Sequence, residues 1–428
     1  MAEKGSLNLR EIFFKKDTKA KKIWKSFDHI LWVIPILLVF LSGILIASTQ
    51  RQANYADWYL HWLTGAIGII LASQIAKIPL GRIRPFLIPL YILSLISLAA
   101  VKVIGVSALG AQRWLSLGFI NIQPSEIAKL VIILSLASVL EKPTLSRNNI
   151  FILIKPILLI LPSLSLVFIQ PDLGTSLVFA AILLTMFYWS GIPIEWILLA
   201  ISAILTAILS GILSWSLYIW IPFLGFLAFK SLPKKFISTS LVIILQTIVA
   251  SITPWLWING LKDYQRDRLV LFLDPSKDPL GGGYHLLQST VGIGSGGIFG
   301  SGLLQGQLTK LRFIPEQHTD FIFSALGEEM GFLGSLFLIV CFSLLIIRLL
   351  KIAKKARTDF ESLVVIGISS MLFFQIVVNI FMTIGLGPVT GIPLPFMSYG
   401  RTALMVNFMS IGLCASVARR ASTLSNKW

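Results

Sequence analysis

The residues best suited to chemistry lie in one long polar segment, Asn259 to Asp320, of a chain that is otherwise mostly apolar. Two acids in this segment, Asp274 and Asp278, stand in the run FLDPSKDPLGGGY. A carboxylate beside an attacking hydroxyl can remove its proton as a general base. Asp-Pro is also a common pair at turns and helix starts, so a structural interpretation of both acids stays open.

Other side chains of this segment suit a phosphorylated sugar. Four cationic or imidazole groups could bind phosphate: Arg266, Arg268, Lys277 and His285. Two amides could bind sugar hydroxyls: Gln265 and Gln288. Loops of this length are usually functional or disordered, and the Leu, Phe, Tyr and Gly content does not fit a disordered linker.

Polar groups also mark the return to the apolar part of the chain: Glu316, His318, Asp320, Glu328 and Glu329. They either line a polar cavity or cap the next helix. The glycine run from Gly292 to Gly297 is a dinucleotide fingerprint only in a loose sense, because no βαβ unit surrounds it. Its glycines instead suit close backbone approach or a nest of N–H groups for an anion.

Two further polar motifs open apolar segments, QPSEIAK at 123–129 and QPD at 170–172. Proline suits the first turn of a helix, and an acid there complements the helix dipole. Glu126 and Lys129 share a helix face at this spacing. They form either a neutralised structural pair or a binding site for an anionic headgroup. In the second case Lys129 is the cation, Glu126 orients it, and the pair flanks a groove open to the outer leaflet. Arg113, followed by Trp114, is either an interfacial anchor or an anion ligand.

The composition explains what must position these residues. The chain has 428 residues, 56% of them hydrophobic and 13% charged, with a mean hydropathy of +0.85. Soluble domains carry about 25% charged residues, and apolar runs of roughly 20 residues cross a bilayer as helices. The chain is therefore predicted to be an all-α polytopic membrane protein. Cys341 and Cys414 lie in apolar runs, and the four histidines lack metal-ligand spacing.

About twelve transmembrane helices are predicted: 29–49, 59–76, 85–105, 126–140, 151–169, 174–190, 194–213, 215–229, 236–257, 321–347, 361–385 and 401–418. The region 194–257 holds either three spans or one span with re-entrant pieces. The net charge of +17 comes mainly from Lys and Arg clusters between spans, so it orients the chain and contacts lipid rather than nucleic acid.

This orientation places both termini in the cytoplasm. The predicted organisation is a basic cytoplasmic segment 1–28, transmembrane helices 29–257, an extracellular catalytic loop 258–320, transmembrane helices 321–418 and a cytoplasmic tail 419–428. No cleavable signal peptide is evident, so the first span is expected to act as the insertion signal.

The motifs in their order along the chain resemble the SEDS family (shape, elongation, division, sporulation). They are QPSEIAK, QPDLGTS, DPLGGGYHLLQS, GIGSGG, PEQHTDFIF, GEEMG and PLPFMSYG. They extend from about Arg113 to Tyr399, and the stretch DYQRDR through LDPSKDPL is more similar to the elongation branch, RodA, than to the division branch, FtsW.

The resemblance implies a bacterial plasma-membrane glycosyltransferase that polymerises lipid II into glycan strands during elongation and shape maintenance. It implies that Asp278, which precedes Pro-Leu-Gly-Gly-Gly-Tyr, is the essential loop aspartate and general base, rather than Asp274. Arg113 and Lys129 are expected to bind pyrophosphate. The full set of predicted substrate-binding residues is Glu126, Lys129, Arg113, Asp172, Gln288, Ser289, Arg268 and His318.

The expected partners are a class B penicillin-binding protein, which is a transpeptidase, together with lipid II and the growing strand. The one cofactor considered is a divalent cation, Mg or Mn, and no organic cofactor is expected. The alternatives are a division-type FtsW-like polymerase, a transporter that flips lipid II, and a scaffold for a transpeptidase.

Two features depart from the family pattern. Members usually have about ten spans, so an extra hairpin near 194–235 is expected. The familiar SYGGS becomes Ser398-Tyr399-Gly400-Arg401-Thr402, which places a charge at the outer end of the last span.

Overall fold

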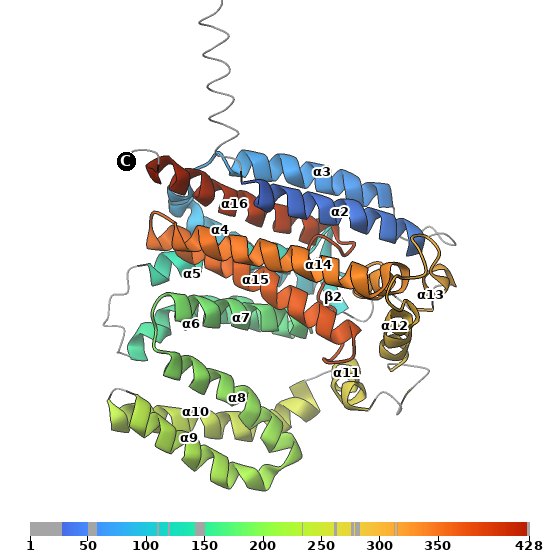
Figure 1. Ribbon diagram of the computed structural model, residues 1–428. Helices are drawn as coiled ribbons and strands as arrows, with labels where there is room; N and C mark the ends of the chain where they lie inside the picture. Colours follow the sequence, from blue (N-terminus) through green and yellow to red (C-terminus); the bar gives the residue numbers. More distant parts are fainter. Residues whose placement is uncertain are drawn as a thin grey trace, which may run out of the picture.

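The computed structural model describes residues 28–49, 58–108, 111–118, 120–141, 150–232, 234–260, 263–274, 278, 283–311, 313–314 and 316–425. All but the last residue of the predicted N-terminal segment 1–28 lies outside these residues. Long helices run side by side through the molecule, and short elements gather at one end of them (Figure 1).

Each of the twelve predicted spans contains a helix. Their bounds are α2 (His29–Thr49), α3 (Trp58–Ile75), α4 (Leu87–Ile104), α5 (Pro124–Leu140), α6 (Ile154–Ile169), α7 (Leu173–Trp189), α8 (Ile194–Ile212), α9 (Leu217–Ser231), α10 (Lys235–Trp255), α14 (Ile322–Lys354), α15 (Asp359–Thr383) and α16 (Arg401–Ser425). Region 194–257 therefore forms three helices, and α16 continues past the predicted end at residue 418.

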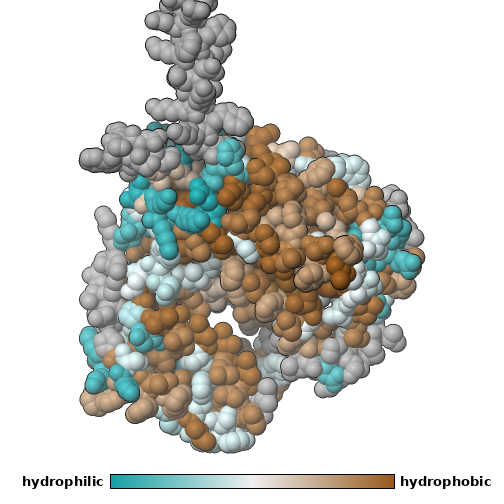
Figure 2. Space-filling model, in the orientation of Figure 1, coloured by the Kyte–Doolittle hydropathy of each residue, from teal (hydrophilic) through white to brown (hydrophobic). Residues whose placement is uncertain are grey.

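Seven of the described helices are long and apolar enough to cross a membrane: α2, α4, α8, α10, α14, α15 and α16. Helices α6 and α7 are apolar but shorter. The space-filling view agrees, because a brown apolar surface separates hydrophilic patches at opposite ends of the molecule (Figure 2). The chain is thus a helical, multi-pass membrane protein, and the number of helices that cross the bilayer stays a prediction.

Helix α15 lies at the centre of the main bundle. It packs against α5, α7, α14 and α16, and most of its side chains are buried. Helices α8, α9 and α10 form a separate group that packs on itself and reaches the bundle mainly from α8 to α7. The surface is hollowed where this group departs from the bundle (Figure 2).

A small antiparallel sheet is the one departure from the all-α prediction in the described residues. It consists of β1 (Val106–Ala108), β2 (Ala111–Leu117) and β3 (Ile120–Ile122), in the order β1-β2-β3. Val106 pairs with Trp114, and Leu115 pairs with Ile122. The strands are too short to stand out from an apolar linker by sequence pattern. They hold Arg113 on the middle strand, just before α5.

The segment 258–320, predicted to be extracellular and called the outer loop below, contains three short helices, α11 (Asp263–Leu273), α12 (Tyr284–Ser295) and α13 (Gln307–Leu311), after a π-helical turn at Leu256–Gly260. Helix α12 packs against α14. On the opposite end of the bundle, two single turns, η1 (Leu80–Arg82) and η2 (Arg84–Phe86), lead into α4. Single turns η3 (Ile150–Leu153) and η4 (Ser214–Ser216) precede α6 and α9.

The glycine-rich part of the loop is joined to α14 by its backbone. Helix α14 breaks at Gly331, where φ is 64°. Phe332 and Leu333 donate their N–H groups to the carbonyls of Gly297 and Ile298, at 2.9 and 3.1 Å. In return, the N–H groups of residues 301 and 302 reach the carbonyls of residues 328 and 329, at 2.9 and 3.0 Å. The groups released by the break are thus satisfied by the loop.

This exchange needs glycine on both sides. A Cβ on Gly331 would lie 2.4 Å from the backbone nitrogen of Gly300, and one on Gly300 would lie 2.2 Å from the carbonyl oxygen of Glu329. Both residues also have positive φ, a region that glycine occupies at no steric cost. Close backbone approach was one of the two roles predicted for the glycine run 292–297. The structure shows it at Gly300, just after that run.

Candidate active site

A small cleft of about 70 Å³ lies at the end of the bundle that carries α11, and it is lined by two arginines from distant parts of the chain. Arg113 comes from β2 and Arg268 from α11. The other lining residues are Pro171, Leu173, Leu177, Gln265, Pro388, Val389 and Thr390. Ligand pockets usually measure about 300–1,000 Å³. This cleft therefore has room for a phosphate-sized fragment rather than for a whole lipid-linked sugar.

Arg113 is held against the start of α7. Its Nη2 donates to the carbonyl of Pro171 at 2.7 Å, and its Nε lies 4.0 Å from Asp172 Oδ2. Among the described atoms, the buried Nε has no hydrogen-bond partner. Buried donors of a charged group are costly to leave unsatisfied. This donor is consequently available to an anion that enters the cleft.

Asp172 has a local structural role that explains its position. It is the N-cap of α7, where Oδ1 accepts from the N–H of Thr175 at 3.2 Å and Oδ2 accepts from the hydroxyl of Thr175 at 2.9 Å. A capping carboxylate of this kind stabilises a helix by about 1 kcal/mol. The same side chain sets the charge beside Arg113.

Asp320 joins this cluster from the end of the outer loop. Burial raises the pKa of Asp320 to about 6, against an opposing effect of Arg268, and Glu316, Arg113 and Asp172 are also near enough to act on it. A Cβ on Gly391 would lie 3.3 Å from Asp320 Oδ2 and 3.7 Å from Arg268 Nη1. Gly391 has φ +71°, so a side chain there would be strained and would crowd both groups.

Glu126 and Lys129 do not lie in an open groove. Lys129 Nζ donates to Glu126 Oε1 at 2.8 Å, and the side chains of Glu126 and Lys129 are only 3% and 1% exposed, respectively. The prediction of a groove open to the outer leaflet at this pair was wrong. Helix α5 packs between α4, α6, α7 and α15, and this packing seals the first turn of the helix. The geometry is that of the neutralised structural pair.

The loop residues lie in different surroundings. Asp278 is exposed, and its carbonyl accepts from the N–H of Gly283 at 3.0 Å. Ser289 is buried on α12, where its hydroxyl donates to the carbonyl of Thr383 at 2.7 Å, so it joins α12 to α15. Gln288 is half-buried. The ring of His318 is half-buried, with its centroid 5.9 Å from that of Tyr399.

The two acids after the loop, Glu328 and Glu329, do not cap α14, which has no acid in its first turn. The carboxylate of Glu328 accepts from the N–H groups of Leu308 and Thr309, at 2.8 and 2.9 Å, and from the hydroxyl of Thr309. Glu329 accepts from the hydroxyl of Ser48 and from the N–H of Leu304. These carboxylates therefore fasten the loop to α14 and α2. Their acidity alone gave no signal that would separate this role from the two predicted ones.

Comparison with known proteins assigns the chain to a family. The profile of the cell cycle protein family that groups FtsW, RodA and SpoVE matches residues 26–221 and 236–423. The chain belongs to this family. Peptidoglycan glycosyltransferase MrdB of Escherichia coli K12 is 38% identical over 399 residues, which cover 92% of this chain and 94% of that protein.

Two solved structures of family members share the fold. A chain of a peptidoglycan synthase complex, solved to show how polymerization and crosslinking are coordinated, matches with a TM-score of 0.69 and 28% identity, covering 92% of this chain and 98% of that one. The rod shape determining protein RodA of Thermus thermophilus matches with a TM-score of 0.61 and 25% identity, covering 92% and 98%.

One departure from the family pattern can be located in the fold. Arg401 is the first residue of α16, half-buried, with its Nη2 3.5 Å from the hydroxyl of Tyr399. Next to it, the hydroxyl of Thr402 donates to the carbonyl of Asn121 at 3.3 Å. The altered motif therefore joins the last helix to the small sheet that carries Arg113.

Among the residues that the structure describes, no group of three or more His, Cys, Asp or Glu side chains could hold a metal ion. The three site residues brought together at the cleft are Arg113, Asp172 and Arg268, and Asp320 and Gln265 join them. The divalent cation stays a prediction.

Proposed function

We propose that this protein is a peptidoglycan glycosyltransferase of the RodA type, which polymerises lipid II into glycan strands during cell elongation and the maintenance of rod shape. Family membership and the near full-length similarity to peptidoglycan glycosyltransferase MrdB support the reaction class. The observation that carries the site is the meeting of Arg113 and Arg268 at one outer cleft.

The leaving group determines what the cleft must do. In the proposed reaction a sugar hydroxyl of lipid II attacks the anomeric carbon of the growing strand, and the bond from that carbon to the pyrophosphate oxygen breaks. Negative charge then collects on the departing undecaprenyl pyrophosphate. Fixed cationic donors aimed at such developing charge lower the barrier. Arg113, with its unsatisfied Nε, and Arg268 are the donors suited to this role.

The attacking hydroxyl must also lose its proton. We assign this to Asp278, which is exposed in the loop that follows α11. Arg268 lies on α11 itself, so the proposed base and the proposed phosphate ligand are close to each other along the chain. Direct displacement without a covalent intermediate inverts the α-linked donor to a β-linkage. A divalent cation would add positive charge beside the leaving group, and no step above depends on it.

We also propose that about twelve helices cross the plasma membrane, with the extra hairpin in the α8–α10 group, both termini in the cytoplasm and residues 258–320 outside. The basic clusters between spans support this orientation. A cysteine introduced by Ser276→Cys, which lies outside the described residues, tests it. Labelling by a membrane-impermeant reagent from outside is expected, and labelling from the cytoplasmic side alone would contradict the topology.

The proposed partner is a class B penicillin-binding protein that crosslinks the strands made here. The similarity to a chain from a peptidoglycan synthase complex supports an assembly of this kind. Co-purification of such a transpeptidase from the native membrane is expected. Full activity of the isolated chain, with no transpeptidase ever recovered, would count against the partner.

The decisive experiment is polymerisation of labelled lipid II by the purified protein and by its Asp278→Asn variant. The amide keeps the shape of the side chain but cannot accept the proton, so at least about a 10²-fold loss of rate is expected. Asp274→Asn is the matched control and is expected to be milder. Normal strands from Asp278→Asn would refute the assignment, and flipping without polymerisation by the wild type would favour a transporter.

A further inference from the structure

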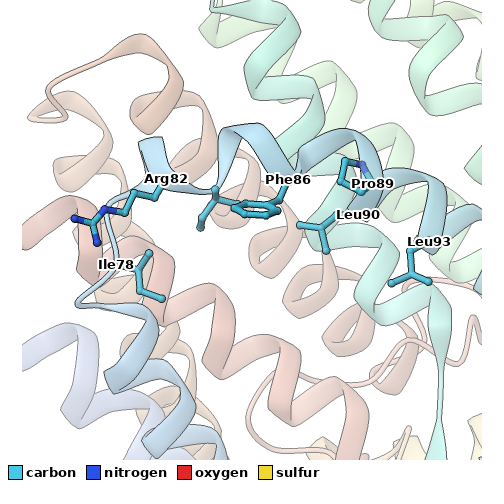
Figure 3. Close-up of a pocket in the computed structure, with 7 residues that line it drawn as sticks. Ile78, Arg82, Phe86, Pro89, Leu90 and Leu93 are labelled. Carbon is cyan, nitrogen blue, oxygen red and sulfur yellow. The ribbon is translucent and has the colours of Figure 1, made fainter.

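A groove lies far from the proposed chemistry, at the end of the bundle where α3 leads into α4. It has a volume of about 520 Å³ and is lined by seven residues. Six of them are apolar: Ile78, Ile83, Phe86, Pro89, Leu90 and Leu93. The seventh is Arg82. The side chains of Phe86, Leu90 and Leu93 follow one another along the start of α4, with Arg82 at the other end of the row (Figure 3).

The apolar wall of this groove faces outward. The side chains of Phe86, at the end of η2, and Leu93, on α4, are both 62% exposed. Leu87, on the same turn, points inward and is buried. Exposed apolar side chains in a row are solvated by lipid tails in a bilayer, and a groove among them restricts a tail to one path.

Arg82 is the charged end of the groove and is not used by the protein. Its backbone N–H donates to the carbonyl of Pro79 at 2.9 Å, but among the described residues its guanidinium has no hydrogen-bond or ion-pair partner. Its neighbour Arg84 is satisfied, because its Nη2 donates to Glu141 Oε1 at 2.8 Å and its guanidinium lies 4.4 Å from the ring centre of Phe360. An exposed arginine with no partner beside an apolar groove suits a phosphate at the membrane surface.

The surroundings of Arg82 are also cationic. Arg420 lies near enough to Arg82, Arg357 and Arg419 for their charges to act on it, and Glu361 is the only acid in that set. A surplus of positive charge attracts anionic headgroups, at about 1 kcal/mol for each basic residue near the surface. The same surplus repels a cationic occupant and gives a zwitterionic headgroup no attraction through net charge.

We propose that this groove is a binding site for an anionic phospholipid of the inner leaflet. The phosphate binds Arg82, and one acyl chain lies along Phe86, Leu90 and Leu93. The site is distinct from the outer cleft of Arg113 and Arg268, and it serves lipid of the surrounding membrane rather than the reacting glycolipid.

The test uses the full-length protein in detergent and measures bound lipid by native mass spectrometry. Cardiolipin and phosphatidylglycerol are compared with phosphatidylethanolamine. The wild type is expected to retain the anionic lipids, and Arg82→Gln to weaken their binding about fivefold, the loss of one basic contact. Lys351→Gln, an exposed basic residue at the end of α14 that does not line the groove, is the matched control.

The acyl-chain half of the proposal is tested by filling the groove. Leu90→Trp is expected to reduce lipid retention, whereas Ile88→Trp, two residues earlier and 73% exposed outside the groove, is not. The site would be overturned if the wild type retained phosphatidylethanolamine as well as the anionic lipids. It would also be overturned if Arg82→Gln and Lys351→Gln retained the anionic lipids equally. If the groove variants Arg82→Gln and Leu90→Trp lost a partner protein but bound lipid as the wild type does, the groove would be the binding site of a protein helix. That result would also overturn the proposal.

Discussion

Two helix starts with similar sequences form two different ion pairs. The motif that begins α5 seals Glu126 and Lys129 away from solvent, whereas the motif that begins α7 leaves Asp172 beside Arg113 at the wall of a cleft. In the first pair Lys129 is almost completely buried with Glu126, and the unsatisfied atom, Glu126 Oε2, is an acceptor closed off from solvent. In the second pair the unsatisfied atom is a donor, Arg113 Nε, and Arg113 lines the cleft. Similar motifs therefore form a closed structural pair in one place and part of the wall of a cleft in the other.

The sealed pair is the place for the largest effect on stability. Lys129→Met leaves the Glu126 carboxylate buried without its partner, and losing one member of a buried pair costs about 3–5 kcal/mol. A large drop in the thermal unfolding midpoint of the detergent-purified protein is expected.

The double variant Glu126→Leu with Lys129→Met separates architecture from catalysis. Well-packed apolar replacements of a buried pair are often neutral, so both stability and polymerisation are expected to recover. Recovered stability with lost polymerisation would show instead that the pair contacts substrate, and the contrast between the two helix starts would fail.

The cleft lined by Arg113 and Arg268 is where we expect a large effect on the polymerisation rate with little effect on stability. Arg268→Gln removes a charged donor from the cleft, and hydrogen bonds to charged groups contribute about 1.5–3 kcal/mol. Polymerisation is expected to slow by roughly 10- to 100-fold. Arg266→Gln, on the same helix but outside the cleft lining, is the comparison and should have the smaller effect. Equal losses in both variants would remove the special role of the cleft.

The smallest expected effect is a pH dependence from Asp320. The folded carboxyl keeps its proton up to about pH 6, whereas an ordinary aspartate loses it near 3.8. Between these values the folded state binds more protons, so stability falls as the pH rises. Each tenfold change in proton affinity between the two states corresponds to about 1.4 kcal/mol. Partial exposure of the side chain and screening by salt reduce the whole effect to on the order of 1 kcal/mol.

Asp320→Asn is expected to flatten this slope. The measurement is the unfolding midpoint at several pH values between 4 and 7, with the wild type in parallel. An unchanged slope in the variant would place the titration on another group and would separate Asp320 from the cluster around Arg268.

The helices were predictable because each corresponds to a long run of apolar residues. Each of the twelve predicted ranges contains a helix, since some fifteen or more apolar residues leave few alternatives in a bilayer. The sheet around Arg113 was missed, because strands of three to seven residues carry too little pattern. The charge pair of α5 was found by its spacing, but its burial depends on α4, α6, α7 and α15, which no local pattern reports.

The cleft could be predicted only in part. Arg113, Asp172 and Arg268 were singled out by residue type and motif, yet their meeting depends on how β2, α7 and α11 come together. Asp320 was noted only as part of the polar segment before the next apolar run, because its burial and the charges of Arg268, Arg113 and Asp172 depend on parts of the chain far from it in sequence. Burial and charge at such a point are properties of the assembled fold.

The backbone exchange at the break of α14 sets an order of events during synthesis. The ribosome delivers residues 297–302 before residues 328–333, so the glycine segment emerges when its hydrogen-bond partners do not yet exist. Glu328 and Glu329, which fasten Thr309 and Leu304, arrive with the same late helix. The part of the loop from residue 297 to residue 309 therefore reaches its observed structure only after the start of α14 has been synthesised. A chain arrested before that point carries every residue of the proposed catalytic loop but no assembled loop.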